Sequence, residues 1–353
     1  MTSSPAATGS QLASRFGLSD RVFVGPRARR LAETLETGLE AVEAAIAAEL
    51  GSADPLVDAM SRYLYEAGGK RVRPMLVLLT AELGDGMTDA VRDAAVALEL
   101  MHIGSLYHDD VMDGADRRRG VPAAHKVWDN STAILAGDLL LARASRVMGR
   151  HGADAVDLQS ETFERLVMGQ LHETVGPAEG DDPIDFYIQV LADKTGSLIA
   201  AAAQAGAHFS GATRDHREAL KAYGEKVGVA FQLADDVIDL SASPGDTGKV
   251  PGTDLRAGVV TMPYLLLQAS TDPRDRDLTR RIDEGVERIR EGADPAILDA
   301  ELAELRDHAV TARTHELAMS WTNEAVDALS DLPRGTVREA LTRFARQLAD
   351  RSS

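Results

Sequence analysis

The sequence predicts an all-α protein, and three observations support this. From about Arg27 onward, apolar residues recur at three- and four-residue spacing, which is the period of an amphipathic helix. No run of residues alternates apolar and polar side chains as a half-buried strand does. Glycine and proline gather between the apolar runs and not within them, which indicates roughly ten or more separate helices.

We predict a single domain over residues 21–353. The chain has 353 residues and no fixed-period repeat. Residues 1–20 are rich in small polar side chains and are predicted to be a disordered tail. Residues 243–261 resemble a long functional loop, and the charged sequence beyond Ser270 predicts solvated outer helices. The clearest predicted breaks between helices are residues 51–55, 84–88, 114–122, 176–183, 211–213, 243–263 and 292–295.

The composition limits the possible functions. With 38 basic and 56 acidic side chains, the formal net charge of -18 opposes non-specific binding to nucleic acid or to an anionic membrane. The chain has no cysteine, so a metal must be held by carboxylates or histidine, and oxygen-rich sites favour magnesium. The start of the chain lacks signal-peptide features, and the small-apolar stretch 198–207 is far shorter than the roughly 20 residues of a membrane span. A cytoplasmic location is expected by default.

A basic segment with the sequence GGKRVRP spans residues 68–74, at the start of an apolar helix. It places Lys70, Arg71 and Arg73 behind two flexible glycines. Ammonium and guanidinium groups beside the free amides of a helix start form an anion site that suits a diphosphate. Taken alone, the segment is equally well explained as a helix-initiating loop with basic residues on the surface.

The first acidic segment, HIGSLYHDDVMD, spans residues 102–113. At about 100° per residue, Asp109 and Asp113 lie on one helix face, and His102 falls two turns earlier on nearly the same stripe. Two carboxylates one turn apart can share a hard cation. The sequence DRRRG follows at residues 116–120, and arginines beside aspartates suit a metal-bound diphosphate better than a bare cation. A lone histidine on an apolar face is otherwise usually a packed core residue.

The second acidic segment, GVAFQLADDVIDL, spans residues 228–240. Asp235 and Asp239 share a face, with Gln232 close to it. A single DDxxD in so acidic a chain would more often be a solvated surface. Both acidic segments, however, lie in strongly apolar helices, where several carboxylates are costly to desolvate unless a cation compensates them. Two such segments in apolar helices therefore favour bound cations over a solvated surface.

With these groups identified, the chain resembles the trans-polyprenyl diphosphate synthase family, long-chain type. Members carry GGKRxRP, a first DDxxD followed by RRG, a Lys-Thr pair and a second FQxxDD. This chain reads GGKRVRP, DDVMDGADRRRG, DKTGS and AFQLADDVID in the same order, and the resemblance covers about residues 66–263. It implies one large helical bundle of the isoprenoid synthase type around a central cavity. The implied reaction joins an allylic diphosphate to isopentenyl diphosphate.

The resemblance also implies a role for each motif residue. The residues implied to hold Mg²⁺ against the allylic diphosphate are Asp109, Asp113 and Asp235, assisted by Asp110, Asp236 and Asp239. The residues implied to complete this clamp are Arg118, Lys194 and Lys249, with Thr195 and Gln232 nearby. The site for isopentenyl diphosphate matches Lys70, Arg73, His102 and Arg119, and Arg71 in the same basic loop is also expected to bind substrate. The groups expected to carry the chemistry are Asp109, Asp113, Arg118, Lys194 and Asp235.

One residue departs from the family pattern. Many members have a lysine after the loop, before Thr-x-Pro, whereas this chain has Val259 there. One diphosphate contact is therefore expected to be absent, which leaves more of that task to Lys194 and Lys249.

Product length in this family is expected to depend on residues just before the first acidic motif. Bulky aromatic residues at the fourth and fifth positions before it resemble a plug for short products, and this chain has Ser105 and Gly104 there, with Met101 one turn earlier. The insertion typical of many short-chain bacterial members is also absent from the motif. We therefore expect a medium- to long-chain product of the kind used as a quinone side chain. The alternative is geranylgeranyl diphosphate, if Met101 or a neighbouring helix closes the tunnel sooner.

Three other functions are compatible with part of this pattern. A terpene cyclase would also use an aspartate-rich magnesium site, but it needs no second diphosphate site. A non-catalytic partner subunit would not need intact aspartates and basic residues. A plain helical scaffold would need none of the motifs. Members of the family are typically homodimers, so a homodimer is expected, and a requirement for a second subunit stays open.

Overall fold

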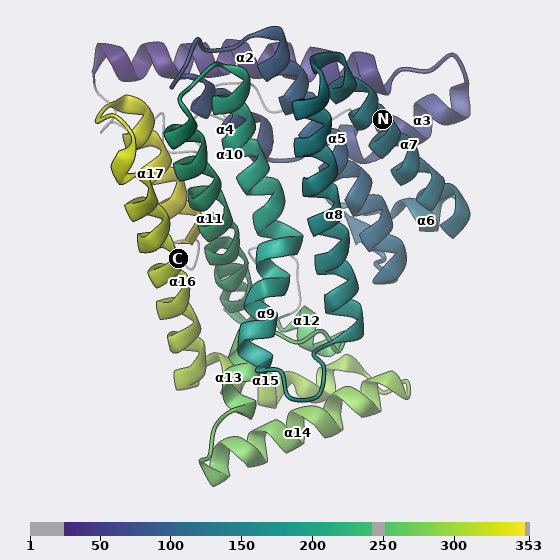
Figure 1. The fold of residues 1–353 in the computed structure, drawn as a ribbon. Coiled ribbons are helices and arrows are strands. Elements are labelled where there is room, and N and C mark those ends of the chain that lie inside the picture. Colours follow the sequence, from purple (N-terminus) through teal and green to yellow (C-terminus); the bar gives the residue numbers. More distant parts are fainter. Residues whose placement is uncertain (1–24, 242–250, 350–353) are drawn as a thin grey trace. The chain divides into compact units, whose positions relative to one another are not determined.

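The computed structural model describes residues 25–241 and 251–349. Within these ranges the regular secondary structure is helical apart from one short hairpin, so the all-α prediction is confirmed (Figure 1). The described residues form two compact units. The first unit comprises the residues up to Leu166 together with Ser197–Gly224 and Ala328–Phe344, and the second comprises Val167–Gly196, Glu225–Asp327 and the residues from Ala345.

Three long helices run through both units, and the other elements belong to one unit each. The shared helices are α8 (Ala153–Val175), α11 (Arg214–Ser241) and α17 (Thr336–Ala349). The further elements of the first unit are α2 (Pro26–Leu50), α3 (Pro55–Glu66), α4 (Val72–Ala81), α5 (Asp89–Met112), β1 (Arg117–Arg118), β2 (Val121–Pro122), α6 (Ala124–Val127), α7 (Asn130–Met148), η1 (Gly149–His151), α10 (Ser197–Phe209) and η4 (Leu329–Asp331). Those of the second unit are α9 (Pro183–Leu191), η2 (Ala192–Gly196), α12 (Thr253–Arg256), α13 (Met262–Gln268), α14 (Pro273–Arg290), η3 (Pro295–Leu298), α15 (Asp299–Arg306) and α16 (Ala309–Ala328).

Several helices begin at a side chain that caps them. Asp54 accepts hydrogen bonds from the amides of Leu56 and Val57 at the start of α3. Thr88 accepts one from Val91 at the start of α5. These short polar side chains satisfy amides that have no partner inside the helix. Both caps lie in segments that the sequence predicted as breaks.

In the first unit, α2 packs across α4 and α5, and Figure 1 shows it running crosswise to the helices beneath it. Its buried residues follow helical spacing, and they are Leu31, Leu35, Gly38, Leu39, Val42, Ile46 and Leu50. The opposite face of α2 carries exposed acidic residues such as Glu40. This amphipathic pattern explains why α2 lies on the surface of its unit.

Close contact between α4 and α10 forms the centre of the first unit. Every residue of α4 from Pro74 to Ala81 is buried, and α10 is rich in alanine. A side chain at Gly206 would place its Cβ 2.0 Å from the carbonyl oxygen of Val77. Only glycine therefore allows the two helix backbones to approach this closely.

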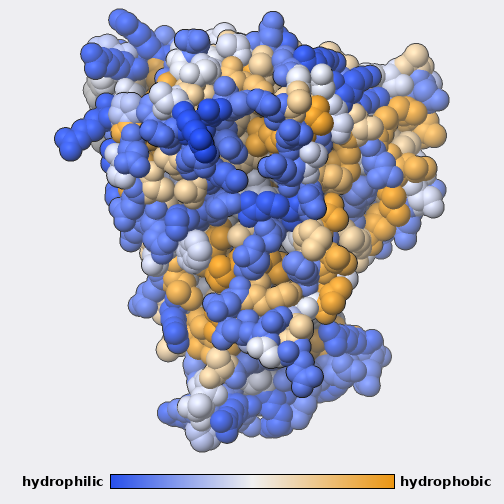
Figure 2. All heavy atoms as spheres, in the orientation of Figure 1, coloured by the Kyte–Doolittle hydropathy of each residue, from blue (hydrophilic) through white to orange (hydrophobic). Residues whose placement is uncertain are grey.

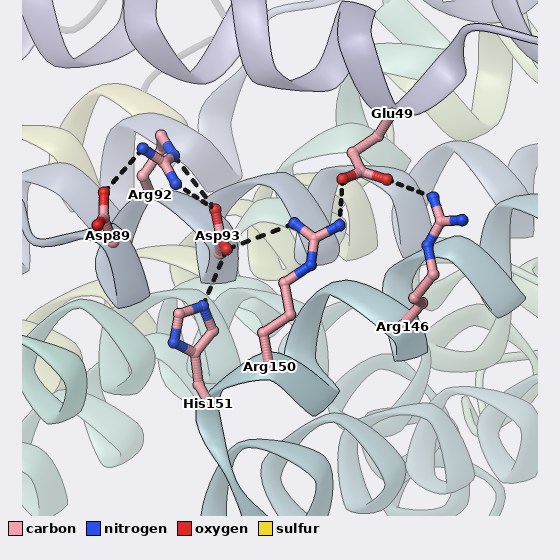
Figure 3. A network of polar contacts seen from close by, with 7 residues as sticks. All are labelled: Glu49, Asp89, Arg92, Asp93, Arg146, Arg150 and His151. Atoms are coloured by element: carbon pink, nitrogen blue, oxygen red, sulfur yellow. Dashed lines mark hydrogen bonds and ion pairs between the residues drawn. The ribbon is translucent and has the colours of Figure 1, made fainter.

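A network of ion pairs joins α2, α5, α7 and η1 within the first unit (Figure 3). Glu49 on α2 binds Arg146 and Arg150, at 2.6 and 2.5 Å. Asp93 on α5 is 8% exposed and accepts hydrogen bonds from Arg92 and His151, both at 2.9 Å. Each buried carboxylate oxygen in this network thus faces a cation, which is the condition for keeping it charged.

The second unit has its own apolar core, built from α11, α13 and the helices that follow. Its buried residues include Leu233, Leu267, Ile282 and Leu305. Along α14 only Leu278, Ile282 and Gly285 are buried. Nearly all of the exposed residues of α14 are charged, which confirms the predicted solvated helix in this part of the sequence.

Two sequence predictions concern residues outside the described ranges. These are the tail at residues 1–20 and residues 243–250 of the long loop. The one-domain assignment stays a prediction, although three helices are common to both units. Among the described helices, none combines the length and the apolar character needed to cross a membrane.

Candidate functional site

The first acidic pair lies at the C-terminal end of α5. The amide of Asp113 donates to the carbonyl oxygen of Asp109 at 2.8 Å, so the two residues are one helical turn apart as predicted. Asp109 is half-buried and Asp113 is exposed. Behind them, Tyr107 is fully buried and donates to the carbonyl oxygen of Met60 at 2.5 Å, while burial raises its pKa to about 12. This buried anchor fixes the end of α5 against α3.

The aspartate between this pair, Asp110, has a different environment. It is 0% exposed, and its Oδ1 accepts a hydrogen bond from Nε of Arg118 at 2.7 Å. Its Oδ2 is buried without a hydrogen-bond partner among the described residues. Burial raises the pKa of Asp110 in spite of the nearby guanidinium. The structure therefore places Asp110 beside Arg118, one of the predicted clamp residues.

A hairpin that the sequence analysis treated only as a break holds the arginines after the acidic motif. Arg118 pairs with Val121, and the turn residues Arg119 and Gly120 have φ angles of 51° and 81°. Positive φ at both central residues is the conformation of a type I′ turn, which matches the twist of paired strands. From this turn, Arg119 donates to the carbonyl oxygen of Leu64 at 2.7 Å. The hairpin is thereby tied to the end of α3.

The basic loop GGKRVRP meets this hairpin. A Cβ at Gly69 would lie 2.6 Å from Nη1 of Arg71 and 3.1 Å from Cζ of Arg119. Gly69 therefore lets two arginines from separate motifs approach the same backbone. Lys70 next to it is exposed. The structure thus brings together two basic segments that the sequence analysis assigned to one diphosphate site.

The nearby positive charges lower the pKa values of Arg73 and His102. Burial and the nearby guanidinium of Arg119 lower the pKa of Arg73 to about 10, although Glu99 opposes the shift. The Nε of Arg73 is buried and has no hydrogen-bond partner among the described residues. Burial lowers the pKa of His102 well below its ordinary value, and Arg73 and Arg119 lower it further. His102 is therefore neutral at physiological pH, beside a cluster of arginines.

The predicted chain-length residues lie in the middle of α5. Met101 is 0% exposed, and Ser105 donates its hydroxyl to the carbonyl oxygen of His102 at 2.9 Å. Gly104 packs against α7, because a Cβ there would lie 3.1 Å from the carbonyl oxygen of Gly137. A larger residue at position 104 would therefore meet α7 first.

In the second unit, the second acidic pair lies near the end of α11. Asp235 and Asp239 are both half-buried and one turn apart in this helix. The Oδ2 of Asp239 accepts from the amide of Asp254 at 3.2 Å, and its carbonyl oxygen accepts from Gly252 at 2.8 Å. Asp239 thus connects α11 to the start of α12.

Asp236, between them, is 2% exposed. Its Oδ2 accepts hydrogen bonds from the hydroxyl of Tyr187 and the amide of Met262, both at 2.9 Å. Burial raises its pKa to about 8. In this structure Asp236 joins α9 and α13 to α11, which is a structural task that the sequence analysis did not foresee.

The Lys-Thr pair lies on a π-helical turn, η2. Two glycines leave room for this turn, since a Cβ at Gly169 would lie 2.6 Å from the amide nitrogen of Lys194, and one at Gly228 would lie 2.3 Å from Cα of Gly196. The hydroxyl of Thr195 then donates to Oε1 of Gln232 at 3.3 Å. Single π-helical turns are frequent at functional sites because they redirect side chains locally.

Three further residues were singled out in the sequence analysis. Lys194 forms an ion pair with Glu173 on α8. Lys249 lies outside the described residues. Val259, which stands where many family members have lysine, is 42% exposed and lines a cavity of about 540 Å³ with residues of α14.

Within residues 25–241 and 251–349, no three histidine, aspartate or glutamate side chains form a group that could hold a metal ion by themselves. Each acidic motif offers a pair of aspartates. Carboxylate oxygens are hard ligands that suit Mg²⁺, which usually keeps waters and substrate phosphates as its other ligands. The first pair belongs to the first unit and the second pair to the second unit, so their sharing of one ion cluster stays a prediction.

Comparison with known proteins identifies the family. Residues 54–292 match the polyprenyl synthetase family. The chain is 40% identical over 325 residues to the nonaprenyl diphosphate synthase of Mycobacterium tuberculosis, an alignment that covers 92% of this chain and 93% of the relative. This chain belongs to the polyprenyl synthetase family.

Solved structures of the family share the fold. The polyprenyl synthase of Caulobacter crescentus, complexed with calcium and isoprenyl diphosphate, has a TM-score of 0.81 at 31% identity, covering 92% of this chain and 98% of that one. The geranylgeranyl pyrophosphate synthase of Corynebacterium glutamicum, in a complex of the same kind, has a TM-score of 0.79 at 39% identity, with the same coverage. The expected helical bundle of the isoprenoid synthase type is thereby confirmed for this polyprenyl synthetase.

The groups that hold the basic loop in place were not predicted from the sequence. Glu43 on α2 lies 2.5 Å from Nε of Arg71, and Glu99 on α5 lies 3.4 Å from its Nη1. Tyr65 stacks on the same guanidinium at 4.6 Å. Glu99 had a visible signal, since a carboxylate in an apolar run three residues before His102 needs a cation nearby. Glu43 had none, because it is one of many acidic residues on an amphipathic helix.

Proposed function

We propose that this polyprenyl synthetase is a prenyltransferase that condenses an allylic diphosphate with isopentenyl diphosphate to form an all-trans polyprenyl diphosphate. The observation that carries this proposal is the basic cluster of Arg73, His102 and Arg119 beside the aspartates at the end of α5. A synthase needs a second diphosphate site of this kind, whereas a terpene cyclase does not. Intact aspartates and arginines also favour a catalytic chain over a regulatory subunit.

The isopentenyl diphosphate would bind to Lys70, Arg73, His102 and Arg119. Crowding of the arginines, which lowers the pKa of Arg73, is unfavourable until an anion is present. Arg73 also keeps a buried Nε without a partner among the described residues, which a diphosphate oxygen would satisfy. Neutral His102 would donate one hydrogen bond without adding charge.

The allylic diphosphate would be held by the acidic pairs through Mg²⁺, with Asp109, Asp113 and Asp235 as protein ligands. Bound Mg²⁺ would neutralise the charge that develops on the leaving diphosphate. Asp110 and Asp236, each already hydrogen-bonded to protein groups, would support their motifs from behind.

The remaining residues of this clamp act on the same diphosphate. Arg118, oriented by Asp110, and Lys194 would donate to its oxygens as the bond to carbon breaks. Thr195 and Gln232, which are hydrogen-bonded to each other, would fix the turn that carries Lys194. Lys249 is proposed to complete the clamp. The double bond of isopentenyl diphosphate then attacks the allylic carbon, and the departing diphosphate takes the proton that is released.

The product is proposed to be of medium to long chain length, a precursor of a quinone side chain. Ser105, one turn before Asp109, is small, and the similar mycobacterial protein is a nonaprenyl diphosphate synthase. Geranylgeranyl diphosphate is the second candidate product for two reasons. Met101, one turn before Ser105 on α5, is fully buried and could close the tunnel sooner. In addition, one of the similar solved structures is a geranylgeranyl pyrophosphate synthase.

We also propose that the enzyme works as a homodimer that packs through a face of the first unit. Large apolar side chains are exposed on α7 and on the part of α8 that belongs to this unit, and Figure 2 shows hydrophobic residues gathering over them. These exposed residues are Ile134, Leu135 and Val156. An apolar surface of this kind marks an interaction site in a chain that is otherwise strongly acidic.

The test is incubation of the purified chain with farnesyl diphosphate, labelled isopentenyl diphosphate and Mg²⁺, followed by sizing of the dephosphorylated products. We expect a product longer than geranylgeraniol. A product that stops at geranylgeraniol would exclude the long-chain proposal but not the reaction. Release of a cyclic hydrocarbon from the allylic substrate alone would favour a cyclase. Sedimentation of the same sample tests the dimer.

A further inference from the structure

The side chain of Arg71 is almost completely engaged by the protein. It is 7% exposed, and its Nε donates to Oε1 of Glu43 at 2.5 Å. Its Nη1 faces the carbonyl oxygen of Gly68 and Oε1 of Glu99, both at 3.4 Å, and its Nη2 donates to the carbonyl oxygen of Tyr65 at 3.3 Å. The ring of Tyr65 lies 4.6 Å from the guanidinium carbon. Little of this guanidinium is left to bind a substrate.

The backbone of Arg71 is also unusual. Its φ of 51° is in the left-handed region, which costs of order 1 kcal/mol for a residue with a side chain. Arg71 stands at the N-cap of α4, so this conformation turns the chain from the glycine loop into the helix. Such a conformation persists only where surrounding contacts determine it. The contacts made by the Arg71 side chain supply that constraint.

The anchor for these contacts is α2, which is remote in sequence. Glu43 accepts from Arg71 and also from the hydroxyl of Tyr65. The hydroxyl of Tyr65 is in addition 3.2 Å from the carbonyl oxygen of Glu43. Glu43, Tyr65 and Arg71 therefore form a closed set of contacts among α2, the end of α3 and the start of α4.

The residues on either side of Arg71 are those that would bind the diphosphate. Lys70 precedes it, Arg73 follows two positions later, and Gly69 places Arg71 and Arg119 against one backbone segment. We propose that Arg71 is a positioning residue, which Glu43 and Tyr65 hold in place so that Lys70, Arg73 and Arg119 converge on isopentenyl diphosphate. This inference rests on the proposed function. It assigns Arg71 to the scaffold of the site and not to its ligands.

For removal of the Glu43 carboxylate, electrostatics alone and the positioning role predict opposite changes in the affinity for isopentenyl diphosphate. Removing a carboxylate near a basic site makes the site more positive, so it should bind an anion more tightly. If Arg71 were a ligand held back by Glu43, Glu43→Gln would lower the KM for isopentenyl diphosphate. If Glu43 positions the loop, the same change misplaces Lys70 and Arg73 and raises this KM.

The experiment compares Glu43→Gln with Glu40→Gln, which removes the same charge from an exposed position one turn earlier on α2. Initial rates are measured with each substrate varied at saturating levels of the other. For Glu43→Gln, we expect the KM for isopentenyl diphosphate to rise about tenfold, with the KM for farnesyl diphosphate changed by less than about twofold. Glu40→Gln should leave both values as in the wild type. An unchanged or lower KM for isopentenyl diphosphate in Glu43→Gln would overturn the proposal.

Tyr65→Phe provides a second variant that keeps the ring on Arg71 and removes only the hydroxyl. Tyr65→Phe should raise the KM for isopentenyl diphosphate by about threefold. If a thermal melt shows that Glu43→Gln is not folded, Tyr65→Phe alone tests whether Arg71 is a positioning residue. No change in Tyr65→Phe would then contradict the proposal. If the wild-type chain consumes no isopentenyl diphosphate, the proposed function fails. Calorimetric titration with inorganic pyrophosphate still tests the positioning role, because weaker binding by Glu43→Gln supports it and equal binding refutes it.

Discussion

Replacing Gly228 with alanine should displace the turn that carries Lys194. A Cβ at this position would lie 2.3 Å from Cα of Gly196 and 2.8 Å from its nitrogen. Ordinary contacts of a Cβ begin at 3.4 Å, so η2 would have to move by about 1 Å. A shift of that size at a reacting group can cost about 10²-fold in rate, and overpacking itself costs about 1–3 kcal/mol.

We therefore expect Gly228→Ala to lower kcat about a hundredfold while the KM for isopentenyl diphosphate stays near the wild-type value. The assay is incorporation of labelled isopentenyl diphosphate at saturating farnesyl diphosphate, with a thermal melt on the same sample. Gly224→Ala is the matched control, because its Cβ would lie 2.5 Å from Cα of Ala200 on α10 and would strain a different contact. A Gly228→Ala enzyme as active as Gly224→Ala would refute the role of this close contact.

Four further substitutions test other parts of the structure. Asp109→Ala and Asp235→Ala should each reduce turnover by orders of magnitude, while circular dichroism and melting temperature stay near the wild-type values. Ser105→Phe should shorten the product, as judged by chromatography of the dephosphorylated prenols. Burial by itself raises the pKa of Asp93, but hydrogen bonds from His151 and Arg92 hold this pKa below its ordinary value of 3.8 (Figure 3). The charged carboxylate therefore stabilises the folded state above pH 3.8. This stabilisation is lost as the pH falls through the lowered pKa. Denaturant titrations should show Asp93→Asn less stable by about 2 kcal/mol at pH 7 and less dependent on pH below 4.

The sequence could predict what local periodicity controls. Asp109 and Asp113 lie one turn apart because the apolar run around them is helical, and the same reasoning placed Asp235 and Asp239. The order of the basic and acidic motifs was also sufficient to indicate the family.

The direction of individual side chains could not be predicted in the same way. Asp110 and Asp236 stand next to half-buried aspartates in sequence, yet both are themselves buried and hydrogen-bonded to protein groups. Their orientation depends on Arg118 and Tyr187, which come from elements distant in the chain. Gly104, similarly, was interpreted as an open position and is in contact with α7.

Tertiary packing also set the local backbone in two places. The π-helical turn at Lys194 depends on space left by Gly169 and Gly228, which come from two other helices. Arg71 has a left-handed conformation, and its side chain is hydrogen-bonded to Glu43 on α2, which is remote in sequence. Neither feature has a signal in its own segment.

The central claim is that this chain couples the loss of diphosphate from an allylic substrate to the addition of isopentenyl diphosphate. The most direct measurement is diphosphate release from farnesyl diphosphate with Mg²⁺, with and without isopentenyl diphosphate. We predict release only when isopentenyl diphosphate is present, with one diphosphate released for each isopentenyl unit incorporated. Equal release without isopentenyl diphosphate would contradict the account.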